Sequence, residues 1–170
     1  MIQPISYGET AIRIASTLAD IGDARTLFVE YVTWLNVDLC FQGIEEELAT
    51  LPGAYAPPRG CLLLAGGGET SDPAAGCVAV RALPYDADGR SSELKRLWVR
   101  PEYRGRRIGH ALTAGALDAA RALGYRTIKL DTLPHLMPNA VAMYRSFGFT
   151  ECEPYYRNPI PGCLYMECLL

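Results

Sequence analysis

The segment from Glu93 to Thr113 constrains the fold more than any other part of this chain. An apolar strand candidate at residues 93–99 runs into a turn rich in Arg and Gly, and a helix candidate follows from Ile108. Such a turn directs several backbone N–H groups, and the positive end of the helix dipole, at one point. That point suits a phosphate group, although an ordinary solvated loop can have the same composition and the spacing is not that of a P-loop.

Length and charge narrow the class of protein. The 170 residues predict a single domain, residues 1–170, and 49% hydrophobic with 21% charged residues is typical of a globular protein with a real core. The net charge of −3 argues against nucleic acid as a partner. Six of the sixteen Lys and Arg residues nevertheless fall between Lys95 and Arg107. This local basicity indicates one specific anion, the alternative being a basic loop that serves solubility.

Cysteine and histidine usage gives no sign of a metal site. The six cysteines form no Cys-x-x-Cys pair, and His110 and His135 are the only histidines, so we expect no metal. The first residues lack the pattern of a signal peptide, and no apolar run approaches the length of a membrane span. We therefore expect a cytoplasmic protein with reduced thiols and no membrane partner.

Hydrophobic periodicity predicts about four helices and six to seven strands in the order β-α-α-β-β-β-α-β-α-β-β. Asp20 or Asp23 is the expected N-cap of the first helix, and the turn at residues 86–89 predicts an antiparallel hairpin. A helix that crosses between two strands favours a parallel connection. The prediction is an α/β (α+β) domain of three layers with one mixed, mostly antiparallel sheet. The expected strands are 12–14, 61–65, 76–83, 93–99, 127–133, 149–156 and 163–169, and the expected helices are 20–35, 44–51, 108–123 and 138–147.

Two motifs in this order resemble the GNAT-type N-acetyltransferases. The turn Arg104-Gly105-Arg106-Arg107-Ile108-Gly109 is similar to the family's Arg/Gln-x-x-Gly-x-Gly/Ala motif, and Met143-Tyr144-Arg145-Ser146-Phe147-Gly148-Phe149 is similar to its Leu-Tyr-x-x-x-Gly-Phe motif. One helix and one strand separate them, as in the family. Two positions depart from the pattern. Arg107 stands where the family often has Gly, which is acceptable if the local φ is negative, and Met137 replaces an Asn that often touches the cofactor.

The resemblance implies acetyl-coenzyme A as co-substrate, with no metal. Its pantetheine arm would bond to the backbone of one strand in the manner of an added strand. Its pyrophosphate would bind at the turn and the helix start. The implied cofactor-binding residues are Leu97, Trp98, Val99, Arg104, Gly105, Arg106, Arg107, Ile108, Gly109, His110 and Ala111.

Transfer of an acetyl group to an amine requires a base, since an alkylammonium has a pKa of about 10. Glu93 is the candidate base because it lies on the strand expected to hold the thioester; it could instead be a structural carboxylate paired with Lys95 or Arg96. The resemblance makes Tyr144 the acid that protonates the sulfur, the alternative being a half-buried aromatic side chain in the core.

The acceptor site is less well marked. By analogy the first two helices line it, with an acidic run that would attract an amine or would simply be an exposed helix face. The candidate residues are Tyr31, Trp34, Tyr55, Glu45, Glu46, Glu47, Asp131, His135, Tyr155 and Tyr156.

The expected function is transfer of an acetyl group from acetyl-coenzyme A to the primary amine of a small molecule or amino-acid-like acceptor, by direct attack in a ternary complex. The alternatives are a catalytically silent acyl-coenzyme A sensor and a protein N-acetyltransferase. A nucleotide-binding module is disfavoured, because the strand before the turn belongs to an antiparallel hairpin. The apolar segment 165–170 offers an edge for a homodimer.

Overall fold

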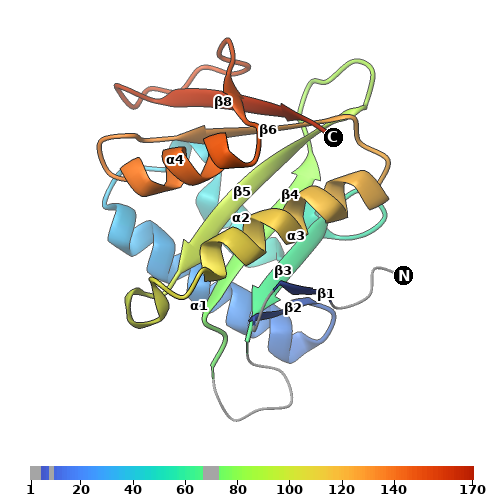
Figure 1. Ribbon diagram of the computed structural model, residues 1–170, viewed down its shortest axis with the longest axis vertical. Helices are drawn as coiled ribbons and strands as arrows, with labels where there is room; N and C mark the ends of the chain where they lie inside the picture. The colour runs from blue at the N-terminus through green and yellow to red at the C-terminus, as the bar shows by residue number, and fades with distance from the viewer. Residues whose placement is uncertain (1–4, 8–9, 67–72) are drawn as a thin grey trace.

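A computed structural model describes residues 5–7, 10–66 and 73–170 (Figure 1). In these ranges one eight-stranded sheet has the strand order β1-β2-β3-β4-β5-β6-β8-β7. Four α-helices pack on it, so the predicted mixed, mostly antiparallel fold is confirmed. The strands are β1 (Ile5–Tyr7), β2 (Thr10–Ile14), β3 (Cys61–Ala65), β4 (Gly76–Ala82), β5 (Ser91–Val99), β6 (Thr127–Thr132), β7 (Thr150–Glu151) and β8 (Leu164–Leu169), and the α-helices are α1 (Leu18–Leu35), α2 (Ile44–Thr50), α3 (Ile108–Ala122) and α4 (Pro138–Ser146).

The molecule has three layers. Figure 1 shows α3 and α4 in front of the sheet and α1 behind it. Leu112 and Ala116 of α3 belong to one buried cluster with side chains from the front face of the strands. Leu27 and Phe28 of α1 belong to a second cluster, with Trp98 of β5, on the opposite face. Period-2 alternation in the strands supplies both faces with apolar side chains.

The sheet splits between β5 and β6. These two strands pair in parallel, as the crossing helix predicted, but the register covers only Ser91–Glu93 against Thr127–Lys129. β5 then stays paired with β4, while β6 stays paired with β8. The second halves of β5 and β6 therefore diverge, and the backbone edge of residues 94–99 that faces β6 is left without a ladder partner in the described chain.

A β-bulge in β5 accompanies the split. The β4–β5 register shifts between Cys77 and Ala79, and Arg96 has a φ of +57°. The extra residue interrupts the alternation, so the adjacent Lys95 and Arg96 both direct their side chains to the face that carries α1 and α2. The left-handed conformation costs a non-glycine residue about 1–2 kcal/mol. Two hydrogen bonds from the Arg96 guanidinium to Glu47 of α2, at 2.9 and 2.8 Å, hold it in place.

Two local predictions were wrong. Thr17, not Asp20 or Asp23, is the N-cap of α1, and Asp20 is its capping-box partner three residues later. The strand expected at 149–156 ends at Glu151, because Pro154 has no N–H to donate to a ladder. Residues 152–163 instead form a loop that crosses the face of β6 and β8, and its Tyr156 hydroxyl donates to Asp131 of β6.

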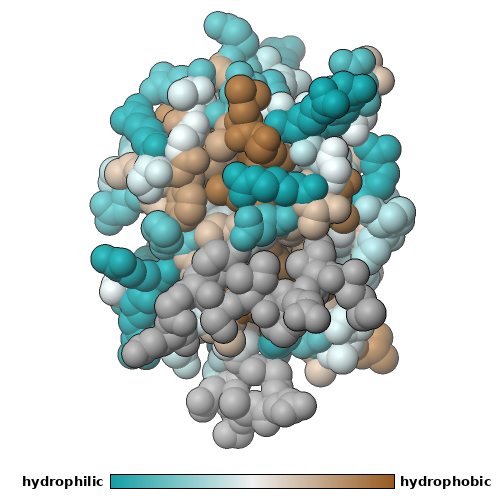
Figure 2. All heavy atoms as spheres, turned by 45° about the vertical axis from the view of Figure 1, so that its right-hand side comes forward, coloured by the Kyte–Doolittle hydropathy of each residue, from teal (hydrophilic) through white to brown (hydrophobic). Residues whose placement is uncertain are grey.

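The surface is mixed in polarity. Figure 2 shows hydrophilic side chains interleaved with apolar ones over the face that it draws. Leu18, Tyr85 and Leu169 are large apolar or aromatic side chains that are exposed. Within the described ranges, no helix combines the length and apolar character needed to cross a membrane.

Candidate active site

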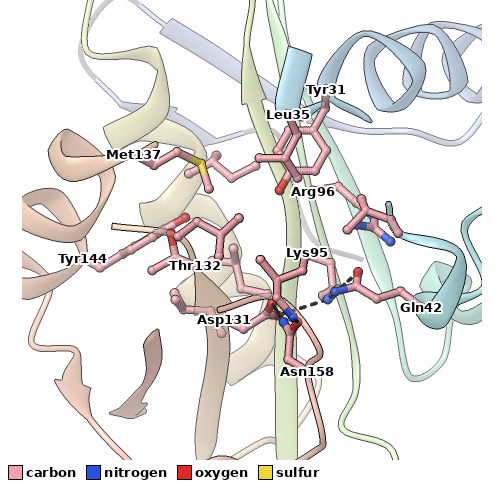
Figure 3. Close-up of a pocket in the computed structure, with 16 residues that line it drawn as sticks. Tyr31, Leu35, Gln42, Lys95, Arg96, Asp131, Thr132, Met137, Tyr144 and Asn158 are labelled. Atoms are coloured by element: carbon pink, nitrogen blue, oxygen red, sulfur yellow. Dashed lines mark hydrogen bonds and ion pairs between the residues drawn. The ribbon is translucent and has the colours of Figure 1, made fainter. Parts of the chain in front are cut away.

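A pocket lies where β5 and β6 diverge (Figure 3). Its walls come from α1, β5, β6, α4 and the loop after β7, and they bring together residues that are far apart in the sequence. Tyr31 of α1 and Tyr144 of α4 enter from opposite sides, and Lys95 and Asp131 lie at its polar end. The lining residues are Tyr31, Leu35, Leu39, Gln42, Leu94, Lys95, Arg96, Leu97, Leu130, Asp131, Thr132, Leu133, Met137, Tyr144, Asn158 and Ile160.

Tyr144 is both a core aromatic and a lining residue of this pocket. Its ring packs against Phe149 with the centroids 5.5 Å apart, and the residue is buried. Burial, with smaller contributions from Tyr31 and Asp131, raises the pKa of the Tyr144 hydroxyl above its usual value. The hydroxyl therefore keeps its proton at neutral pH and can donate it.

The Gly/Arg turn lies beyond the end of β5 and begins α3. Gly105 has a φ of +79°, which glycine adopts without steric cost. Arg107, the N-cap of α3, has a φ of +61°, so the condition of a negative φ, under which a side chain is acceptable at this position, is not met. No side chain in the described chain caps the α3 N-terminus, and the first N–H groups of a helix have no intrahelical partner. The turn thus presents free N–H groups beside exposed arginines.

The side chains predicted to bind the cofactor are mostly occupied within the protein. The Arg104 guanidinium lies 4.8 Å from the centroid of the Trp98 ring and 5.3 Å from that of Trp34, and its Nε donates to the Val99 carbonyl at 3.1 Å. Arg106 lies over Tyr103 at 5.4 Å. These contacts hold the turn against the end of β5.

Most side chains at the start of α3 are also packed within the protein. The His110 ring packs on Phe147, with centroids 4.3 Å apart. Ile108 and Ala111 are buried in the core. Only their backbone can face a ligand, whereas Gly109 is half-buried and leaves ordinary contact space for a Cβ beside Met143 and Val99.

Glu93 lies behind the pocket, in a network of its own. Its carboxylate is 2% exposed; it accepts from Arg81 Nε at 2.9 Å and from the Tyr155 hydroxyl at 3.1 Å. Arg81 Nη2 lies 2.7 Å from the same carboxylate, and Lys95 Nζ lies 3.7 Å away. The predicted pairing with Lys95 is therefore present, and Arg81 is the nearer partner.

A hydrogen-bonded ring at the polar end of the pocket includes Lys95, the more distant ion-pair partner of Glu93. Lys95 Nζ donates to Asp131 at 3.2 Å and to Gln42 Oε1 at 3.3 Å, the Tyr156 hydroxyl donates to Asp131 at 2.9 Å, and Gln42 Nε2 donates to Tyr156 at 3.1 Å. Burial alone would raise the pKa of Asp131, but Lys95 and the Tyr156 hydrogen bond outweigh it and lower that pKa. Asp131 is therefore an ionised anchor.

Sequence reasoning named Lys95 only as a structural partner of Glu93, and it missed Gln42. Lys95 could have been found from the strand period, which places it on the same face as Glu93 two residues earlier. Gln42 lies in a short 3-10 helix at Cys40–Gln42 and gave no signal.

The other predicted acceptor residues are dispersed. Tyr55 is buried, and its hydroxyl donates to Glu47 at 2.9 Å. Glu47 also accepts two hydrogen bonds from Arg96 of β5, so its carboxylate is not free to attract an amine. Glu45 and Glu46 are exposed, and His135 is exposed and does not line this pocket. In the described ranges, no three His, Cys, Asp or Glu side chains gather closely enough to hold a metal ion.

Comparison with known proteins identifies the family of this chain. The profile of the acetyltransferase (GNAT) family matches residues 29–149. An uncharacterized N-acetyltransferase of Schizosaccharomyces pombe is 40% identical over 167 residues, which is 98% of this chain and 97% of the relative.

Solved structures share the fold. An acetyltransferase from Streptococcus agalactiae superposes with a TM-score of 0.73 at 18% identity, over 96% of this chain and all of the other (100%). The structure of yncA from Salmonella typhimurium with its cofactor acetyl-CoA gives a TM-score of 0.65 at 16% identity, over 95% of this chain and 94% of the other. The chain therefore belongs to the GNAT family of N-acetyltransferases.

Proposed function

We propose that this protein transfers an acetyl group from acetyl-coenzyme A to the primary amine of a small molecule, by direct attack in a ternary complex. The observation that carries the proposal is the pocket between β5 and β6, which is lined by Tyr144 and by the ion pair of Lys95 with Asp131. The Gly/Arg turn follows the same strand, β5, and Glu93 lies on that strand two residues before Lys95. The likeness to a neighbour solved with acetyl-CoA supports the donor.

The donor fits the split in the sheet. β5 beyond Glu93 has no ladder partner on its β6 side in the described chain, so the amide groups of a pantetheine arm can bond to residues 97–99 as an added strand would. The pyrophosphate then reaches the N–H groups around Gly105 and Gly109 and the positive end of the α3 dipole. Arg106 and Arg107 are exposed there and add positive charge.

The chemistry follows from the groups around the pocket. The neutral amine attacks the thioester carbonyl, the new C–N bond forms and the C–S bond breaks. Before the attack, the ammonium passes one proton to Glu93, directly or through water. As the C–S bond breaks, Tyr144 donates a proton to the departing sulfur, and the second proton released by the attacking nitrogen restores the Tyr144 hydroxyl through water. The Tyr144 hydroxyl lines the pocket and is protonated at neutral pH, as an ordinary tyrosine with a pKa of about 10 is, so it has a proton to donate when charge develops on the sulfur.

The test is thiol release from acetyl-coenzyme A with a panel of amines, for the wild type and Tyr144→Phe. We expect turnover to fall about 100-fold or more in the variant, the usual contribution of a general acid, with the Kd for acetyl-coenzyme A unchanged. Tyr125→Phe is the matched control, because this buried tyrosine donates to the Arg59 carbonyl away from the pocket. An unchanged rate in Tyr144→Phe removes Tyr144 from the mechanism. Tight acetyl-coenzyme A binding with no release for any amine favours the sensor.

A further inference from the structure

We propose that the acceptor is a zwitterionic amino acid with an apolar side chain, whose carboxylate binds Arg81 and Lys95 while its amine binds beside Glu93. This inference rests on the proposed function and names the acceptor class of the same site. It is drawn from a second cavity next to the pocket, from the balance of charges around both, and from the exposed aromatic rim.

The second cavity has a volume of about 270 Å³ and is lined by β4, β5, the 3-10 turn at Cys40–Gln42 and the loops after β4 and β7. Gln42 and Lys95 line both this cavity and the pocket, so the two spaces are neighbours. One wall is charged, with Arg81, Glu93 and Lys95, and the rest is largely aromatic. The volume suits a small molecule.

The charges around the two spaces balance. Arg81 Nη2 lies 2.7 Å from the Glu93 carboxylate, and Lys95 Nζ lies 3.2 Å from the Asp131 carboxylate. All four side chains line the pocket or the cavity. The remaining cation of the lining, Arg96, faces Glu47 at 2.8 Å. Lys129 Nζ lies 5.7 Å from the centroid of the Tyr155 ring and is paired with Glu167 at 3.0 Å, so it adds no net charge beside the cavity.

A balanced site discriminates against a simple amine. An ammonium ion that entered it would leave one uncompensated positive charge in a largely buried network, which is costly. An amino acid brings one charge of each sign and leaves the balance unchanged. The site therefore favours a zwitterion over the corresponding amine.

The network has one loose contact at which a zwitterion fits. Lys95 Nζ and Glu93 are 3.7 Å apart, beyond hydrogen-bond distance, while each has a closer partner elsewhere. A carboxylate placed on Lys95 and Arg81 would put the adjacent amine within reach of Glu93. This position also lies beside the pocket that Tyr144 lines, where the thioester is proposed to bind.

The rim of the cavity indicates the side chain of the acceptor. Phe41 is 38% exposed, and Tyr85 is fully exposed with a φ of +64°, so two aromatic rings border the cavity with little cover from the protein. Tyr85 follows Pro84, which also lines the cavity. Apolar surface of this kind is stabilised when an apolar group covers it. An aliphatic or aromatic side chain is therefore expected to be preferred over a charged one.

The experiment compares acceptors that differ only in the carboxylate. Leucine is paired with 3-methylbutylamine and with leucinamide, and phenylalanine with 2-phenylethylamine, and kcat/KM is measured for each with acetyl-coenzyme A. We expect each amino acid to exceed its neutral-ended partners by about tenfold or more, the factor typical of a charged hydrogen bond. In Arg81→Gln that ratio should fall toward one. Lys129→Gln is the control and should keep the wild-type ratio, because Lys129 does not line the cavity.

Because the readout is a ratio within each variant, partial loss of folded Arg81→Gln does not change it. Arg81→Lys, which keeps the positive charge, should retain part of the preference. Equal or faster acetylation of the amines by the wild type overturns the zwitterion proposal and leaves the proposed function standing. Failure to acetylate any of the five acceptors overturns the zwitterion proposal, and it overturns the proposed function as well only if the panel of amines also gives no thiol release. An unchanged ratio in Arg81→Gln also overturns the assignment of the carboxylate to Arg81.

Discussion

Single residues with left-handed backbone mark the donor side of the site. Arg96 and Arg107 both have positive φ, at +57° and +61°, and each is an arginine where glycine would be free of steric cost. Arg96 has a buried partner in Glu47 that stabilises its conformation. Arg107 is exposed, so the steric cost at that position is retained in the folded protein. This difference suggests that the Arg107 side chain is useful to a ligand rather than to the fold.

Replacing Arg107 separates these two effects. Arg107→Gly removes both the steric cost and the charge, whereas Arg107→Ala removes the charge and keeps the left-handed strain. We expect Arg107→Gly to be more stable than Arg107→Ala by about 1 kcal/mol, measured by urea unfolding. Both variants should bind acetyl-coenzyme A more weakly than the wild type, most clearly at low salt, as measured by calorimetry. Equal affinity for all three proteins at low salt would show that Arg107 does not contact the phosphates.

Some residues of the site were within reach of sequence reasoning and others were not. Tyr144 carries a family motif and does line the pocket, while its role as an acid stays a prediction. Glu93 and Lys95 share a strand face, but their partners Arg81 and Asp131 lie on neighbouring strands. The period of the side chains along one strand does not determine how that strand is aligned with its neighbours, so these pairs could not be predicted. Gln42 comes from a 3-10 turn with no periodic signal, so only the fold brings it to Lys95.

At the scale of elements, the bulge in β5 contributes both to the stability of the fold and to the unpaired edge of β5 that is proposed to bind acetyl-coenzyme A. The Arg96 guanidinium and the Glu47 carboxylate are both nearly buried, and their two hydrogen bonds tie α2 to the point where β5 leaves β6. Burial alone would raise the pKa of Glu47, but the hydrogen bonds and charge of Arg96 outweigh it and lower that pKa. The pair is thus ionised at neutral pH and joins α2 to the bulge in β5.

Breaking this pair should damage the fold and the cleft together. Glu47→Gln leaves a buried guanidinium without its countercharge, and we expect a loss of about 3–5 kcal/mol in the free energy of unfolding. Acetyl-coenzyme A binding should weaken as well, because the bulge is no longer held. The double variant Arg96→Gly, Glu47→Gln is the control, since glycine adopts the left-handed conformation without a charge. It should recover much of the stability. A double variant as unstable as Glu47→Gln would contradict the view that an unpaired charge is the cause.

The same scale shows where prediction of elements succeeded. The turn at residues 86–89 predicted the β4–β5 hairpin, and the crossing helix predicted that β5 and β6 are parallel, because both features are local in sequence. The strand expected at 149–156 was too long because apolar and aromatic composition outweighed the signal of Pro154 in that prediction. β1, with three residues, was not predicted, since so short a strand has little periodicity.

For the whole molecule, ionised carboxylates act as ties between layers. Glu47 joins α2 to β5, Glu30 joins α1 to Arg100 just beyond β5, and Asp131 joins β6 to β5 and to the loop after β7. The pKa of Glu30 is lowered, chiefly by its hydrogen bonds from Arg100, and the pKa values of Glu47 and Asp131 are lowered against the effect of burial. Each tie therefore favours the folded state only while its carboxylate is ionised.

This arrangement predicts how the stability depends on pH. A carboxyl group with a lowered pKa in the folded state binds its proton more readily in the unfolded state, so acid favours unfolding. We expect the free energy of unfolding to be nearly constant from about pH 7 to about pH 5 and to fall below about pH 4.5, near the usual pKa of Asp and Glu. Each tie contributes at most about 1.4 kcal/mol per pH unit to that decline. Urea unfolding at a series of pH values measures it.

Asp131→Asn tests whether one such tie is ionised in the folded protein. The variant should be less stable than the wild type at about pH 7, because Lys95 loses its countercharge, and its stability should fall less steeply below about pH 4.5, because one titrating group is gone. The two curves should therefore converge in acid. Curves that stay parallel down to about pH 3.5 would mean that Asp131 binds its proton equally in both states, which would contradict the lowered pKa of Asp131. Convergence would support an ionised Asp131 that holds Lys95 in place at neutral pH, which the proposed zwitterion site requires.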